Sequence, residues 1–183
     1  MESGRGKPLP YDHILTSHFA KEDTPMFRDL ARKNKRLPHE TCIALLKDER
    51  RGILSVHGED GYPYGMPMNH FYNEDDGCLY FHCGRAGHRL DALRANDKVS
   101  YCVMDKGVRP EGEWAYNVQS VIVFGRVEII DDWDTMVDIT TRLSRLFPCG
   151  EEYIRKEIAQ SGKGTLLLKM TPDHICGKRV NEA

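Results

Sequence analysis

Long apolar runs, export signals and paired cysteines are all missing from this sequence. No stretch approaches the roughly 20 apolar residues that a membrane-spanning helix needs. The beginning, MESGRGKPLPYDH, has no apolar segment of the kind found in secretory signal peptides. The six cysteines form no CxxC pair, so we expect reduced thiols rather than a disulfide framework. These absences predict a soluble, cytoplasmic protein without a membrane partner.

A large excess of charge of either sign is missing too. The 183 residues include 26 Lys and Arg against 28 Asp and Glu, which gives a net charge of -2. Proteins that bind nucleic acid usually carry a clear basic surplus, because they neutralise backbone phosphates. We therefore expect no nucleic-acid partner.

Several well-known catalytic motifs are absent. The sequence contains no GxSxG nucleophile elbow and no HExxH zinc motif. It also lacks the P-loop and the dinucleotide-binding GxGxxG pattern. If the chain is an enzyme, a bound cofactor has to carry the chemistry while the protein supplies position and hydrogen bonds.

The length and the apolar content predict one domain. With 183 residues of which 40% are hydrophobic, the chain can bury a sizeable core. Residues 1–25 show no apolar period and include Pro8, Pro10 and Pro25, which is typical of a flexible N-terminal arm. We assign residues 26–183 to a single domain.

Strand patterns dominate this domain. Five segments alternate or run apolar between turn sequences such as EDG and NEDDG: residues 52–58, 63–72, 78–83, 98–104 and 117–130. Helical spacing is found at residues 38–48, 131–147 and 151–159, and a last strand at 165–170 with a bent continuation over 174–180. Because the first turns are too short for parallel crossovers, we expect a mainly β fold, an antiparallel barrel or curled sheet with flanking helices.

The strand over residues 117–130 is apolar on both faces. In the run from Val121 to Phe124 every residue is apolar, so one face can fill the barrel while the other must meet a helix or a second subunit. Homodimerisation is the simplest inference. Gly125 interrupts the run, as glycine does at a bulge or where another backbone approaches closely.

The segment FHCGRAGHRLDALRAN, residues 81–96, joins a strand to a helix that begins near Gly87 or His88. Free backbone N–H groups and the positive end of the helix dipole then lie beside His88 and Arg89, which predicts an anion site. A glycine-rich loop without a ligand is the plain alternative. A metal site built from Cys78, His82, Cys83 and His88 is disfavoured, because His82 and Cys83 are adjacent and point to opposite sides of a strand.

Four segments taken together carry a family resemblance. GILSV, EDGYPYGMPMNHFY, YFHCGRAGHRLDALRANDKVSYCV and QSVIVFGRVEII, in this order, resemble the flavin-binding split-barrel superfamily of pyridoxamine 5'-phosphate oxidase, and within it the nitroimidazole-resistance (Nim-type) branch. The resemblance covers about residues 30–179. It implies an antiparallel split β-barrel of the FMN-binding type and a homodimer that holds FMN at the subunit interface.

The resemblance also implies a set of cofactor contacts. The second barrel strand would lie along the flavin ring with Met66, Pro67, Met68, Asn69 and His70. The phosphate and ribityl chain would meet His82 and Cys83, and the phosphate would be held by Gly87, His88 and Arg89. A polar residue just before the VIVFG run, Gln119 or Ser120, would also face the cofactor. His70 is the candidate catalytic residue. Trp114 and Tyr116, after a long loop, are candidates for a lid over the ring.

The function that this resemblance implies is an FMN-dependent oxidoreductase that reduces a small organic acceptor such as a nitro compound. Vitamin B6 oxidation is not expected, because the chain ends HICGKRVNEA rather than in the tryptophan- and arginine-rich segment of the oxidase. The alternatives are a flavin- or haem-binding barrel without turnover and an empty barrel that serves as a dimeric scaffold. FAD or a deazaflavin in place of FMN, the substrate and the electron donor stay open.

Overall fold

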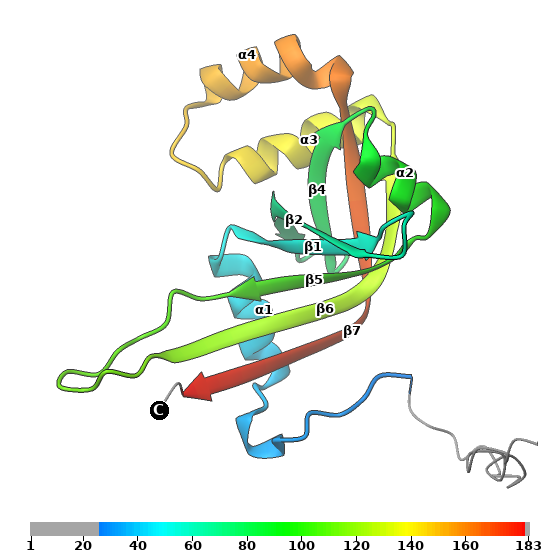
Figure 1. Cartoon of the computed structure of the whole chain (residues 1–183). Coiled ribbons are helices and arrows are strands. Elements are labelled where there is room, and N and C mark those ends of the chain that lie inside the picture. The colour runs from blue at the N-terminus through cyan, green and yellow to red at the C-terminus, as the bar shows by residue number, and fades with distance from the viewer. Residues whose placement is uncertain (1–25, 182–183) are drawn as a thin grey trace, which may run out of the picture.

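A seven-stranded antiparallel sheet is the framework of the computed structural model, which describes residues 26–181 (Figure 1). The expected N-terminal arm, residues 1–25, lies outside the described residues. The strands are β1 (Arg51–His57), β2 (Pro63–Asn69), β3 (Phe71–Asn73), β4 (Cys78–Gly84), β5 (Lys98–Met104), β6 (Asn117–Ile130) and β7 (Thr165–Asn181). The α-helices are α1 (His39–Asp48), α2 (His88–Ala95), α3 (Trp133–Ser144) and α4 (Glu151–Ser161), with short 3-10 turns at Lys33–Lys35 and Gly162–Gly164.

The sheet is curled so that its two edges belong to neighbouring segments of the chain. The strand order is β2-β1-β5-β6-β7-β4-β3, and β2 and β3 are separated by a single residue, His70. The prediction of one continuous strand over residues 63–72 was wrong in this detail. Residues up to Asn69 pair with β1, and residues from Phe71 onward pair with β4. One continuous segment of the sequence therefore supplies both edge strands of a split barrel.

The core fills the inside of the curl. Side chains that alternate inward from β1, β5 and β6, such as Leu54, Tyr101 and Val121, are fully buried. Helix α1 packs on β7, where a Cβ at Gly177 would overlap the Sγ atom of Cys42. The expected class, mainly antiparallel β with flanking helices, is confirmed.

Helices α3 and α4 form a hairpin between β6 and β7, with α4 outermost (Figure 1). The Asp132 carboxylate caps α3 by accepting from the N–H of Thr135 at 2.9 Å. Met136 and Ile139 of α3 pack with Cys78, Tyr80 and Leu167 in a second apolar cluster. The helix hairpin therefore covers the outside of β4 and β7. No helix between residues 26 and 181 is long and apolar enough to cross a membrane.

Gly125 shows both features that its sequence position predicted. The β6–β7 register shifts between Phe124 and Gly125, and a Cβ at Gly125 would overlap the carbonyl oxygen of Thr171. The neighbouring backbone thus occupies the space that any other residue would need.

Replacing Gly125 with alanine should lower the free energy of unfolding by about 2 kcal/mol, because the backbone of β7 has to move to accept the methyl group. Urea denaturation monitored by circular dichroism measures this. Gly164→Ala is the control, since no atom lies within 4 Å of its added Cβ. Equal stability of both variants would contradict the close packing at Gly125.

Candidate functional site

The junction between β4 and α2 has the geometry that the sequence predicted. Strand β4 ends at Gly84 and α2 begins at His88. Gly87 precedes the helix with a φ of 122°, a backbone conformation that favours glycine. A Cβ at Gly84 or Gly87 would meet no atom within 4 Å. The backbone in front of the helix is therefore open to a ligand.

A cavity of about 220 Å³ lies at this junction. It is lined by Tyr64, Gly84, Ala86, Leu90 and by four predicted site residues, Cys83, Gly87, His88 and Arg89. The Tyr64 ring stacks on the His88 ring with centroids 4.4 Å apart and an interplanar angle of 10°. This contact fixes the orientation of the imidazole at the helix start. Arg89 Nε donates to Met66 Sδ at 2.9 Å, which holds the guanidinium against β2.

A second cavity, of about 310 Å³, continues along β2. Its lining consists of Arg51, Pro67, Met68, Asn69, His82 and Arg89. Arg89 lines both cavities. We call the two together the β2–α2 groove. It places the predicted phosphate residues and the predicted ring strand next to one shared residue, Arg89.

The strand geometry decides which groups of β2 face this groove. Met66 and Met68 point inward and are 5% and 7% exposed, whereas Pro67 is on the outer face. Arg51 of β1 lies beside the strand, and its Nε donates to Asn69 Oδ1 at 2.9 Å. Arg51 could not be assigned to the site from the sequence, because its place opposite Asn69 depends on the β1–β2 register.

His70 does not reach the groove. The residue is 1% exposed, and its Nε2 lies 2.7 Å from the carbonyl oxygen of Leu46 while Nδ1 lies 2.8 Å from the Tyr101 hydroxyl. Burial lowers the pKa of His70 to about 4. A neutral ring must donate from Nε2, because a carbonyl oxygen only accepts, so Nδ1 accepts from Tyr101. The position gives His70 a structural environment and does not support the expected catalytic role.

The Tyr101 hydroxyl also links this network to the groove. It lies 2.9 Å from the carbonyl oxygen of Met68 as well as near His70, and its single hydrogen is shared between the two acceptors. Burial raises the pKa of Tyr101 well above its usual range. The buried pair therefore fixes the backbone of β2 at the point where the strand ends.

Gln119 and Ser120 lie on β6 and line neither cavity of the groove. The N–H of Gln119 donates to Asp105 Oδ1 at 3.0 Å, which anchors the β5–β6 connection. Trp114 is 73% exposed on the same connection, and Arg109 lies over the Tyr116 ring at 5.7 Å. A single chain does not bring these residues to the groove.

The titratable groups of the groove favour binding rather than nucleophilic attack. Desolvation lowers the pKa of His82, and the charge of Arg89 lowers it further. Burial raises the pKa of Cys83, opposed by Arg89, so the thiol stays protonated at neutral pH. Within residues 26–181, no three His, Cys, Asp or Glu side chains lie close enough together to hold a metal ion. Cys78 packs under α3 instead.

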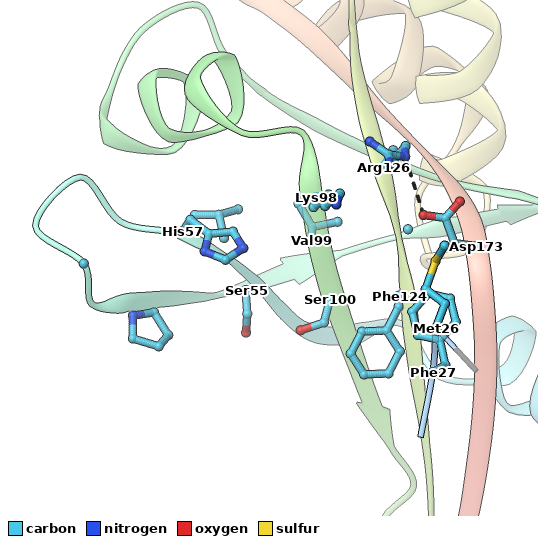
Figure 2. A pocket seen from close by; sticks show the side chains of 14 residues that line it. Met26, Phe27, Ser55, His57, Lys98, Val99, Ser100, Phe124, Arg126 and Asp173 are labelled. Carbon is cyan, nitrogen blue, oxygen red and sulfur yellow. Dashed lines mark ion pairs between the residues drawn. The ribbon is translucent and has the colours of Figure 1, made fainter. Parts of the chain in front are cut away.

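The outer face of the sheet carries a further cavity, of about 390 Å³, which shares no residue with the groove (Figure 2). Ser55, Ser100 and Phe124 project to the same side from three adjacent strands. Phe27 closes one wall, stacked on His174 with centroids 4.7 Å apart. Arg126 at the rim pairs with Asp173.

An apolar row runs beside this cavity across five strands. Pro67, Ile53, Cys102, Ile122 and Cys176 are successive register partners from β2 to β7. All six cysteines of the chain are free thiols, and Cys102 in this row is exposed. The row is the outward apolar face that the run from Val121 to Phe124 predicted.

Comparisons with known proteins agree with the overall fold. Residues 38–179 match the pyridoxamine 5'-phosphate oxidase family. Similar solved structures include a candidate 5-nitroimidazole antibiotic resistance protein of Bacteroides thetaiotaomicron (20% identity, 80% of this chain and 87% of that chain, TM-score 0.63), a conserved hypothetical protein of Mycobacterium tuberculosis (15%, 80% and 88%, TM-score 0.67) and an FAD-binding protein of Mesorhizobium loti (21%, 80% and 97%, TM-score 0.58). Identities this low show a shared fold. No curated protein matches the sequence.

Proposed function

Since the chain belongs to the pyridoxamine 5'-phosphate oxidase family, we propose that it binds a flavin, FMN, in the β2–α2 groove and acts as an oxidoreductase on a small organic acceptor. The observation that carries this proposal is the groove itself. One arginine, Arg89, joins a helix start suited to a phosphate with a strand suited to a flat ring.

The residues of the groove fit such a cofactor. No atom lies within 4 Å of the position that a Cβ would take at Gly84 or at Gly87. Phosphate oxygens can therefore approach the backbone N–H groups of the first turn of α2. Arg89 offers a forked set of donors to the same oxygens. Both cavities border Arg89, an arrangement that suits a ligand with an anionic end and a planar end.

The residues that line the groove have different roles in this proposal. His88, held by Tyr64, and Arg89 bind the phosphate, and the backbone of Pro67 and Asn69 orients the ring. Arg51 places a positive charge at the far end, where it favours negative charge on the ligand. When bound, the flavin supplies two-electron redox chemistry, which no side chain of the groove provides.

The terminal phosphate is the reason for preferring FMN. The helix start lies at one end of the groove and suits a phosphate monoester, although a related solved structure is named an FAD-binding protein. Mass spectrometry of the chromophore released by heating separates FMN, FAD and a deazaflavin.

A homodimer completes the proposed site. Gln119 and Ser120 cannot reach the groove of their own chain, but a second copy on the outer face would bring its β6 toward β2. The apolar row from Pro67 to Cys176 supplies the surface for that contact. Burying exposed apolar side chains in this way is favourable by about 25 cal/mol per Å².

The test of function is the behaviour of the purified protein. We expect a yellow protein whose flavin is reduced anaerobically by NADH or NADPH and reoxidised rapidly by a nitro compound. Flavin that neither nicotinamide reduces would favour a binding module without turnover. A colourless protein that takes up no added FMN would contradict the proposal.

The dimer contact gives a separate prediction. Ile122→Ala should raise the dimer dissociation constant about ten-fold, because it removes apolar contact from the centre of the row. Analytical ultracentrifugation measures it. Val137→Ala, a similar loss on α3, is the control and should leave the dimer unchanged. A normal dimer in Ile122→Ala would place the interface elsewhere.

A further inference from the structure

A cavity of about 260 Å³ lies between α3, α4 and the end of β4. Met136 and Leu143 of α3 and Ile154 and Ile158 of α4 form its apolar walls. Figure 1 shows the two helices side by side above β4, with α4 farther from the sheet. The cavity is thus a feature of the helix hairpin rather than of the barrel interior.

His82 connects this cavity to the β2–α2 groove. The residue lines both spaces, so the two cavities meet at His82. A molecule between the helices would lie beside the place where the flavin ring is proposed to bind. This adjacency distinguishes the cavity from the one on the outer face, which shares no residue with the groove.

Packing keeps the cavity open. Met136, Leu143 and Ile154 are at most 4% exposed, so their positions are fixed by the fold. At one end Gly162 packs closely against α3, since a Cβ there would stand 3.0 Å from both Met136 Cε and Trp133 Cζ3. The helix ends are linked by a forked ion pair, with Arg145 Nε and Nη2 at 2.7 and 2.9 Å from the two carboxylate oxygens of Glu151.

The polar groups of the lining indicate the kind of ligand. Hydroxyl-bearing residues, among them Ser144 and Ser161, also line the space, and Glu157 is its one carboxylate. No lysine or arginine lines it within the described chain. An anion would therefore meet a negative charge without any compensating cation, whereas a neutral molecule finds apolar walls and a few hydrogen-bond partners.

We propose that the cavity between α3 and α4 binds the acceptor, and that this acceptor is a small, neutral, largely apolar molecule. The inference rests on the proposed function, because the groove beyond His82 is assigned to the flavin. It excludes phosphorylated substrates from this position.

Direct binding to the flavin-free protein tests the inference without turnover. Trp114→Phe leaves Trp133, at the end of the cavity, as the single tryptophan. Nitrobenzene, a neutral quencher, should reduce the fluorescence of this variant saturably, and 4-nitrobenzoate should need about ten-fold higher concentration. Quenching that is linear in nitrobenzene would overturn the inference.

Charge variants on α4 sharpen the test. In the Trp114→Phe background, Glu157→Gln should improve 4-nitrobenzoate binding about five-fold, as removal of one nearby charge does at a partly exposed position. Glu152→Gln, on the same helix but outside the lining, should change nothing. Equal effects of the two substitutions would show that general charge, not this cavity, governs binding.

A blocking variant provides the last control. Ser144→Leu should fill the space and abolish saturable quenching while the circular dichroism spectrum is retained. Visible absorbance after adding FMN to the Trp114→Phe protein, without the blocking substitution, reports the proposed function independently, and the two readouts are compared in that protein. Flavin uptake without saturable nitrobenzene quenching overturns the cavity inference alone, and quenching without flavin uptake overturns the proposed function, on which the role as acceptor site rests.

Discussion

Arg89→Ala is expected to weaken FMN binding about 100-fold and to leave the protein a folded dimer. The guanidinium lines both parts of the β2–α2 groove, and a hydrogen bond to a charged group contributes about 1.5–3 kcal/mol. Arg89 is half-buried and its guanidinium contacts Met66 from outside the core, so its loss is expected to remove ligand contacts more than core packing. Titration of flavin-free protein with FMN, followed by flavin fluorescence, gives the dissociation constant.

Riboflavin separates the phosphate contact from other effects. Because it lacks the phosphate, it should bind wild type and Arg89→Ala with nearly equal affinity. Arg94→Ala is the matched control, since Arg94 lies on α2 and pairs with Asp91 away from the groove. Full FMN affinity in Arg89→Ala would show that the phosphate lies elsewhere.

Acidification should destabilise the protein through His70, by about 3 kcal/mol between pH 6.5 and pH 4. Burial lowers the pKa of His70 from 6.5 to about 4 in the folded state. Below pH 6.5 the unfolded chain binds a proton on this ring and the folded chain does not, so the free energy of unfolding falls by about 1.4 kcal/mol per pH unit until the folded ring is protonated as well. Above pH 6.5 His70 contributes no slope.

Urea denaturation at several pH values measures this slope. His70→Gln is expected to be less stable at pH 7 but to lose most of the slope between pH 6.5 and 4. His57→Ala, which replaces an exposed histidine of β1, should keep it. An unchanged slope in His70→Gln would mean that carboxyl groups, not this histidine, govern acid unfolding.

The parts of the site that depend on local chemistry could be predicted from the sequence. The turn at Gly87 and the start of α2 are set by neighbouring residues, so His88 and Arg89 lie where the spacing placed them. The apolar run before Gly125 likewise predicted both a buried and an outward face. Each of these features needs only a few consecutive residues to form.

The parts that depend on long-range pairing could not be predicted. His70 turns inward because the chain changes partner from β1 to β4 at that residue, and no local pattern marks such a change. Arg51 meets Asn69 only through the β1–β2 register. Ser120 reaches a groove only if a second chain supplies it. These contacts join residues far apart in sequence or on separate molecules.

The edge position of β2 has a consequence for the ligand-free protein. Among residues 26–181 this strand pairs with β1 alone, which leaves one row of its main-chain amides and carbonyls without a ladder partner. Such a row is a template for adding another strand. A planar heterocycle with polar atoms along its rim can occupy that row, so the proposed ring contact can be made by main-chain groups of β2 although the side chains of Met66 and Met68 point inward. Loading with cofactor would therefore also guard against aggregation.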